Sequence, residues 1–170
     1  METESTQAAI EALLDEQRTF PPPEDFAAHA LVNDDSVYRR ADDDPEGFWR
    51  GLADEFIDWF KEPTKGLEWD PPHCTWFADG ELNVAWNCLD RHVEAGKGDR
   101  VAYHWVGEPD GESADLTYAE MLREVSRLAN ALRKLGVSKG DRVGIYMGMV
   151  PELPVAMLAC ARIGAPHVVV

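Results

Sequence analysis

Cysteine is scarce in this chain, which has three among 170 residues. The number is odd and Cys74, Cys88 and Cys160 lie far apart, so reduced thiols in the cytoplasm are expected rather than a disulfide framework. No apolar run approaches the roughly 20 residues that a membrane-spanning helix requires. The N-terminal segment METESTQAAIEALLDEQ is acidic and lacks the positively charged start of a signal peptide. These absences predict a cytoplasmic protein that does not enter a membrane.

Lysine and arginine are also few, 16 against 32 Asp and Glu, which gives a formal net charge of −16. Nucleic-acid binding is disfavoured, because phosphate contacts need clustered cations. The acid is unevenly distributed: residues 1–60 carry 16 acidic side chains against 4 basic ones, and residues 61–170 carry 16 against 12. We interpret the excess as a solvated acidic surface on the N-terminal part of the chain.

The N-terminal region predicts short helices separated by breaks. An amphipathic helix is expected over 5–17, and the prolines at 21–23 end it. Residues 24–44 are polar and acidic and are expected to be extended or loosely helical. Asp44 and Pro45 have the form of an N-cap and a first-turn proline.

The segment that follows, 46–60, predicts an aromatic-rich helix that ends before Pro63. Its apolar residues recur near helical spacing and suit packing against a larger body: Phe48, Trp49, Leu52, Phe56 and Phe60. Residues 64–80 predict an ordered loop held by two tryptophans, Trp69 and Trp76. A further helical stripe starts at Leu82 and ends at Gly96; its other members are Trp86, Leu89 and Val93.

Strands and helices alternate in the last 70 residues. The expected elements are a strand at 101–106, a helix from Thr117 to Gly136, a strand at 142–147, a helix from 151 to 163 and a strand from 167. The spacing Thr117-x-x-Glu120 is a capping box, and Gly136 stands where a helix often ends. The second helix is rich in small residues, so it is expected to lie close against a sheet.

This alternation predicts the α/β class: a helical and irregular leader, then the first βαβαβ part of a mostly parallel sheet. We place the boundary between residues 1–95, the leader, and residues 96–170, the start of the α/β domain. Ligands of such sheets bind at the carboxyl ends of the strands, and the third strand is reached only at the last residues. The chain is therefore interpreted as the opening of a longer enzyme. The pentapeptide KGDRV occurs at 97–101 and 139–143, before a strand each time, and predicts one turn used twice.

No residue is assigned a catalytic, cofactor-binding or metal-binding role from the sequence. Neither phosphate-loop pattern, G-x-x-x-x-G-K-[ST] or G-x-G-x-x-G, is present, and Gly148 alone is weak support for a phosphate contact. The possible zinc ligands His73, Cys74, Cys88 and His92 fit no established spacing, and packing is the better role for the cysteines.

The remaining polar candidates are also better explained without catalysis. Asp90, Arg91 and His92 are consecutive on a helix and point in different directions, so they predict salt bridges and not a triad. Cys160 is expected to be buried packing, and His104 is expected in the core or at an interface. His167 is weighed as a site residue because it opens the last strand.

Three phrases of the sequence resemble one enzyme family. They are WFADGELNVAWNCLDRH (76–92), LTYAEMLREVSRLANALRKLGVSKGDRVGIYM (116–147) and VPELPVAMLACARIGAPHVVV (150–170). They resemble the N-terminal portion of the acetyl-CoA synthetases, the AMP-forming acetate–CoA ligases of the adenylate-forming superfamily. The second and third phrases recur across the superfamily, whereas the first is more typical of the acetate and short-chain branch. The resemblance extends from about Tyr38 to Val170.

The resemblance implies a two-step reaction with ATP, Mg²⁺, acetate and CoA. Acetate and ATP give acetyl-adenylate and pyrophosphate, and the CoA thiol then gives acetyl-CoA and AMP. The phosphate loop, acyl pocket, adenine-binding segment and lid lysine of such enzymes are expected beyond Val170, so this chain is expected to be scaffold, inactive alone and poorly soluble in isolation. Two alternatives stay open: a ligase for propionate or another short acyl chain, and a non-catalytic interaction module on the same scaffold.

Overall fold

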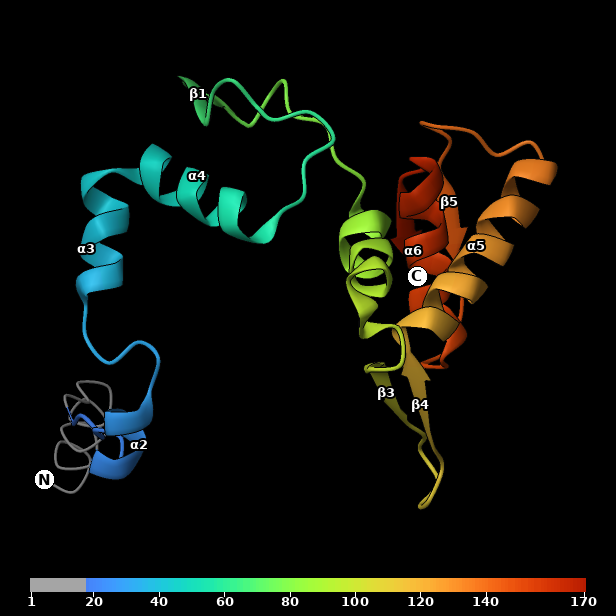
Figure 1. The fold of residues 1–170 in the computed structure, drawn as a ribbon, viewed down its shortest axis with the longest axis horizontal. Helices are drawn as coiled ribbons and strands as arrows, with labels where there is room; N and C mark the ends of the chain where they lie inside the picture. Colours follow the sequence, from blue (N-terminus) through green and yellow to red (C-terminus); the bar gives the residue numbers. More distant parts are fainter. Residues whose placement is uncertain (1–17) are drawn as a thin grey trace, which may run out of the picture. The chain divides into compact units, whose positions relative to one another are not determined.

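The computed structural model describes residues 18–170 (Figure 1). The chain divides into two compact units, the first ending at Pro45 and the second running from Glu46 to Val170. The first unit contains helices α2 (Glu24–His29) and α3 (Ser36–Asp43), neither of which has a buried residue. The polar segment before Asp44 is thus partly helical. The helix expected over 5–17 lies outside the described residues.

Helix α4 (Pro45–Phe56) begins at the expected proline but ends four residues before the expected position. The backbone beyond it makes other hydrogen bonds: Asp58 N–H donates to Asn87 Oδ1 at 2.8 Å, and Phe60 N–H donates to the Glu81 carbonyl at 2.7 Å. These longer-range bonds replace the continuation of the helix. Two aromatic side chains of the expected apolar face, Trp49 and Phe56, are about half exposed within this chain.

The expected loop at 64–80 contains an antiparallel hairpin, which corrects the prediction. Its strands are β1 (Leu67–Asp70) and β2 (His73–Trp76), with Trp69 opposite Cys74. Every residue of β2 is exposed, so no buried face produced an alternating pattern that sequence analysis could recognise. Trp69 is 69% exposed and does not hold the segment.

The helical stripe that starts near Leu82 is confirmed, with a different winding. It contains two single-turn π-helical segments, η1 (Trp86–Asp90) and η2 (Val93–Lys97). The backbone leaves the helix at Gly96, where φ is +74°. The predicted end of the helical stripe is therefore correct.

Strand β3 (Val101–Val106) is found where expected, but its partner was not predicted. It pairs antiparallel with β4 (Ser113–Thr117) in a sheet of two strands, and Gly107 N–H donates to the Glu112 carbonyl at the turn. The sequence GEPDGESAD predicted a single acidic turn, because the polar side chains at the start of β4 do not give the apolar pattern of a strand. The expectation that 101–106 belongs to the parallel sheet is therefore wrong for the described residues.

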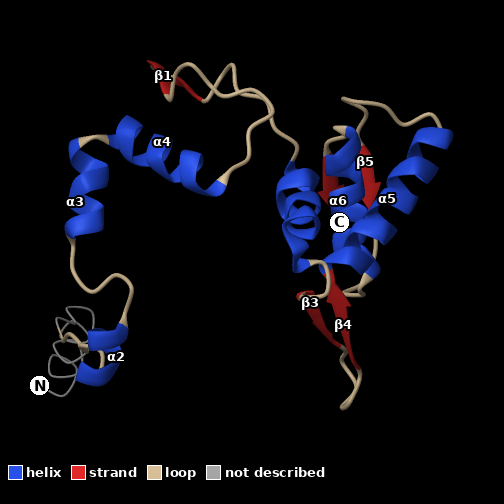
Figure 2. Cartoon of the chain, in the orientation of Figure 1, coloured by secondary structure: helices blue, strands red, loops and turns tan. Residues whose placement is uncertain are grey.

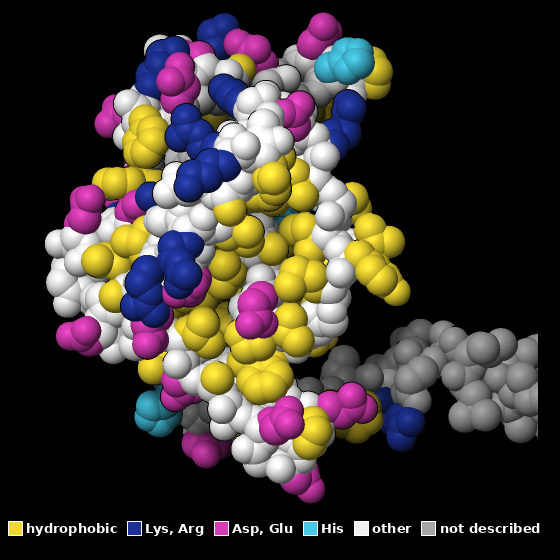
Figure 3. Space-filling model, turned by 90° about the vertical axis from the view of Figure 1, so that its right-hand side faces the viewer, with side chains coloured by type: hydrophobic (Ala, Val, Ile, Leu, Met, Phe, Trp, Pro, Cys, Tyr) yellow, Lys and Arg dark blue, Asp and Glu magenta, His cyan; other side chains and the backbone are white. Residues whose placement is uncertain are grey.

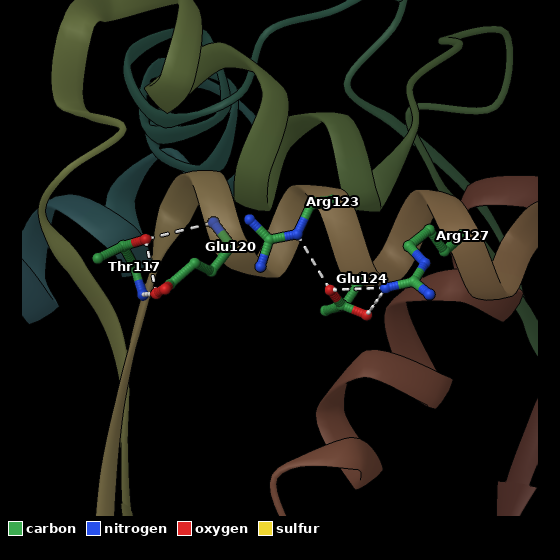
Figure 4. A network of polar contacts seen from close by, with 5 residues as sticks. All are labelled: Thr117, Glu120, Arg123, Glu124 and Arg127. Atoms are coloured by element: carbon green, nitrogen blue, oxygen red, sulfur yellow. Dashed lines mark hydrogen bonds and ion pairs between the residues drawn. The ribbon is translucent and has the colours of Figure 1, made fainter.

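Helix α5 (Tyr118–Lys134) is confirmed with both of its end signals. The Thr117 hydroxyl accepts from Glu120 N–H at 3.2 Å, and the Glu120 carboxylate accepts from Thr117 N–H at 2.9 Å (Figure 4). At the other end Gly136, with φ +94°, donates to the Arg133 carbonyl, and Val137 N–H donates to the Leu132 carbonyl. This is the Schellman arrangement, which glycine adopts at little steric cost.

The rest of the chain forms a parallel pair of strands joined through a helix (Figure 2). Strands β5 (Val143–Ile145) and β6 (His167–Val169) pair in parallel, and α6 (Glu152–Ile163) connects them. Helix α6 packs on α5 around a core of buried residues: Leu89, Met121, Val125, Ala129, Val155 and Ala159. The small residue Cys160 packs beside Ile145 of β5. The predicted α/β class and the close approach of α6 to the strands are confirmed.

The two KGDRV copies do not form the same turn. Gly98 of the first copy has φ −57°, in the right-handed region, whereas Gly140 of the second has φ +92°. Both copies still lead into a strand, at Val101 and at Val143. After the break at Gly96 the backbone returns to right-handed angles at Gly98, so only the second copy requires the conformational freedom of glycine.

The capping box predicts a pH-dependent contribution to stability. Hydrogen bonds from the Thr117 backbone and hydroxyl lower the pKa of Glu120 from its usual 4.5. A lowered pKa means that this contribution is present above pH 4.5 and is lost as the pH falls through the folded-state value. We expect Thr117→Ala to cost about 1 kcal/mol at pH 7 and less in strong acid. Urea unfolding at pH 7 and pH 3, with Glu120→Gln as control, measures the difference; an equal cost at both pH values would contradict it.

Candidate functional site

The carboxyl ends of β5 and β6 form the edge at which a parallel sheet of this kind binds ligands. After the buried Ile145 the chain turns outward, and Tyr146 and Met149 are 90% and 84% exposed. Val170 continues the pairing, because its N–H donates to the Ile145 carbonyl at 2.9 Å. This edge is apolar and accessible, and Gly148 lies in its loop with no positive φ that would indicate a phosphate-binding turn.

The described residues do not fit a magnesium or triphosphate site. No group of three or more His, Cys, Asp and Glu side chains within residues 18–170 is placed to hold a metal ion. Helix α6, which starts behind the edge, is preceded by Pro151 and has no side-chain cap.

The four residues weighed as zinc ligands are not brought together. His73 and Cys74 lie on β2, and both are exposed. Cys88 is also exposed, on η1, so the expectation that the cysteines pack in the interior is wrong for Cys74 and Cys88. A free thiol at an exposed position makes fewer contacts than a buried one, and nothing in the sequence distinguished the two environments.

Asp90, Arg91 and His92 point to three different partners, as expected. Arg91 pairs with Asp58 at 3.3 Å. The His92 ring packs on Tyr118, with ring centres 4.8 Å apart, and burial lowers its pKa, to which the cations Arg91 and Lys97 add. The three residues form no catalytic triad.

Asp90 forms a partly buried ion pair that joins the helical stripe of residues 82–96 to α6. Its two carboxylate oxygens accept from Arg162 at 2.7 and 2.8 Å, and these bonds raise the pKa of Arg162. Asn83 adds a second link, because its side-chain amide donates to the Arg162 carbonyl at 3.1 Å. A salt bridge was predicted for Asp90. Its partner was missed, although Arg162 is the one cation of α6.

The other candidates have structural roles. His104 is exposed on β3 and contacts Asp115 at 2.7 Å, so it does not lie in the core of this chain, and the alternative of an interface position stays a prediction. His167 opens β6 at its amino end, away from the carboxyl edge. Cys160 is buried, as predicted.

The three thiols are expected to react at different rates. Cys74 and Cys88 are exposed, whereas Cys160 is 1% exposed and burial raises the pKa of its thiol. The thiolate is the reactive form. Iodoacetamide at pH 8 should therefore modify Cys74 and Cys88 at least about ten-fold faster than Cys160. Mass spectrometry of the peptides measures the rates. Equal rates in the folded protein would contradict the burial of Cys160.

A large cavity lies at the opposite end of the strands. It has a volume of about 820 Å³ and is lined by the ends of α5 and α6, with Arg133, Lys139 and Arg162 as its cations. Cations near helix C-termini complement the helix dipole, and Arg162 is already paired with Asp90. In the view of Figure 3, hydrophobic side chains gather over the middle and lower part of the molecule, and Lys and Arg side chains lie above and beside them. The cavity therefore needs no ligand to explain its charges.

Two family models match consecutive parts of the chain. Residues 35–88 match the acetyl-coenzyme A synthetase N-terminus, and residues 89–170 match the AMP-binding enzymes. The structure is similar to that of acetoacetyl-CoA synthetase from Streptomyces lividans, with a TM-score of 0.75 and 26% identity over 91% of this chain and 26% of that one. The fold is thus that of the first part of an AMP-binding enzyme.

Curated relatives narrow the family further. The chain is 58% identical over 159 residues to acetyl-coenzyme A synthetase of Streptomyces coelicolor, covering 93% of this chain and 24% of that protein. It is 53% identical over 153 residues to the Rubrobacter xylanophilus acetyl-coenzyme A synthetase, covering 90% and 24%. The chain belongs to the acetyl-coenzyme A synthetase family and matches the N-terminal part of its members. It spans about a quarter of the length of these relatives.

Proposed function

We propose that this chain is the N-terminal part of an acetate–CoA ligase. The whole enzyme activates acetate with ATP to acetyl-adenylate, with release of pyrophosphate, and transfers the acetyl group to CoA with release of AMP. ATP, Mg²⁺ and CoA are bound by the whole enzyme, and the reaction takes place in the cytoplasm. The observation that carries this proposal is the 58% identity to a protein named acetyl-coenzyme A synthetase across 93% of the chain.

In this proposal the chain contributes scaffold and no catalytic residue. The carboxyl edge of β5 and β6 presents apolar side chains, while Asp90 and Arg162 are used in fixing one helix to another. Residues 1–95 act as the leader and residues 96–170 begin the AMP-binding domain, because the backbone leaves the helical stripe at Gly96 and enters β3 five residues later. The isolated chain is expected to have no ligase activity.

Two other functions are weighed against acetate activation. A ligase for propionate or another short acyl chain has the same fold, and the similar structure is named an acetoacetyl-CoA synthetase at 26% identity. A non-catalytic interaction module would bury its own apolar surface. Large apolar side chains remain exposed here, among them Tyr146, Met149 and Val170, which favours the ligase over the module.

A hybrid enzyme tests whether the chain is ligase scaffold. In the hybrid, this chain replaces the matching quarter of the Streptomyces coelicolor acetyl-coenzyme A synthetase. We expect acetyl-CoA formation from ATP, acetate and CoA within about ten-fold of the parent enzyme, since a ten-fold loss corresponds to about 1.4 kcal/mol. A soluble, folded hybrid without activity would favour the interaction module. Because the hybrid takes its acyl pocket from the relative, the acid itself must be tested with the product of the complete reading frame.

A further inference from the structure

The hairpin of β3 and β4 makes a specific contact with the loop at the carboxyl edge. Trp105 lies on β3, and its indole N–H donates to the Met149 carbonyl at 2.7 Å, across 44 residues of sequence. The hairpin is a separate sheet from β5 and β6, so no backbone ladder fixes the two relative to each other. The indole hydrogen bond is thus a direct tie between them.

Gly107, which has no side chain, leaves room for the Trp105 ring beside the turn of the hairpin. A Cβ atom on Gly107 would lie 2.7 Å from the Glu112 Cβ and 2.9 Å from the Trp105 ring, both closer than side chains approach one another. The ring therefore lies against the turn of the hairpin, with one side on a residue that has no side chain. Its half-buried position and its short hydrogen bond define one orientation for the indole.

The loop it reaches, 146–151, has little else to define it. Its own backbone bonds are local, from Val150 N–H to the Gly148 carbonyl at 2.9 Å and from Leu153 N–H to the Val150 carbonyl at 3.0 Å. Tyr146 and Met149 extend into solvent. A loop with exposed side chains and few long-range bonds opens readily, so we expect the Trp105 bond to be a main constraint on its backbone.

We propose that Trp105 is a positioning residue for substrate binding, which acts by holding the loop 146–151 as one wall of the ligand-binding edge. The proposal rests on the proposed ligase function, because ligands of such sheets bind at the carboxyl ends of the strands. Trp105 does not touch the reacting atoms. Loss of its hydrogen bond loosens the loop, weakens ground-state and transition-state binding alike, and so raises KM with little change in kcat.

Three variants of the hybrid enzyme test this. Trp105→Phe removes the indole N–H and keeps an aromatic ring, and Gly107→Ala crowds both Glu112 and the Trp105 ring at the turn without changing the indole itself. Tyr103→Phe is the matched control, since it also removes one polar atom from an aromatic residue of β3. We expect the first two to raise KM for at least one of ATP, acetate and CoA about three- to ten-fold, as for one lost hydrogen bond, with kcat within about two-fold. The control should change neither.

Hydrogen exchange separates the possible failures. The amides of 146–151 should exchange faster in Trp105→Phe and Gly107→Ala than in Tyr103→Phe. Unchanged KM values for all three substrates in an active, folded Trp105→Phe enzyme would overturn the proposal, and so would a fall in kcat alone, which indicates a smaller folded fraction. A soluble, folded parent hybrid without activity would instead count against the ligase function. Unchanged exchange of the 146–151 amides in Trp105→Phe would by itself refute the anchoring role of Trp105.

Discussion

Replacing Asp90 by alanine should destabilise the chain by about 2–3 kcal/mol. The substitution leaves Arg162 without its carboxylate partner, and the Arg162 side chain is only 29% exposed. Removing one partner of a fully buried pair costs more, about 3–5 kcal/mol, and the partial exposure of Arg162 reduces this figure because water screens the remaining charge. Urea unfolding followed by circular dichroism measures the loss.

Two further variants show whether the ion pair is the cause. Asp58→Ala breaks the more exposed pair with Arg91 and should cost less than about 1 kcal/mol. The double variant Asp90→Leu, Arg162→Leu removes both charges and should recover most of the lost stability, because apolar side chains often replace a buried pair without penalty. If Asp90→Ala were no more costly than Asp58→Ala, the Asp90–Arg162 pair would not be the link between η1 and α6 that the structure indicates.

Leu89→Ala should cost about 2–4 kcal/mol. Leu89 is 3% exposed and belongs to the cluster that joins η1 to α5 and α6. Shortening it removes apolar contacts from two helices and leaves a cavity that the packed small residues of α6 cannot fill. The free energy of unfolding in urea is again the measurement.

Leu135→Ala is the control for this substitution, because Leu135 follows α5 and is 81% exposed. Its cost should lie within about 0.5 kcal/mol, as for other surface changes. Similar losses for the two leucines would show that the cluster around Leu89 is not a packed core in solution.

Elements with a strong local signal were predictable from the sequence. Helix α5 has a capping box at Thr117 and a glycine at 136, and both ends lie within two residues of their predicted positions. Helix α6 and β6 follow from Gly164, which ends one and precedes the other. In these segments the local hydrogen-bonding signals and the buried face agree, so periodicity and end residues were sufficient.

Elements that depend on pairing were not predictable. Strand β4 is mostly polar, and its structure comes from its hydrogen bonds with β3. The β1–β2 hairpin has no buried face on β2. The difference between Gly98 and Gly140 likewise follows from the preceding segment, because five identical residues cannot determine two different turns by themselves.

The sequence predicted where the candidate site lies in the fold but not which contacts arrange it. The rule for parallel sheets predicts a site at the carboxyl edge of β5 and β6, where the exposed residues are apolar. The contacts that arrange this edge join residues far apart in sequence: Trp105 with Met149, and Asp90 with Arg162. No spacing rule connects such positions, so the structure was needed to find them.

Acetate-dependent release of pyrophosphate from ATP, measured with the product of the complete reading frame that contains this chain, tests the central claim most directly. The account predicts release with acetate and Mg²⁺, weaker release with propionate, and none from the 170-residue chain alone. A folded, soluble product that releases no pyrophosphate with acetate would contradict the assignment as an acetate–CoA ligase. Release by the 170-residue chain would contradict its role as scaffold without catalytic residues.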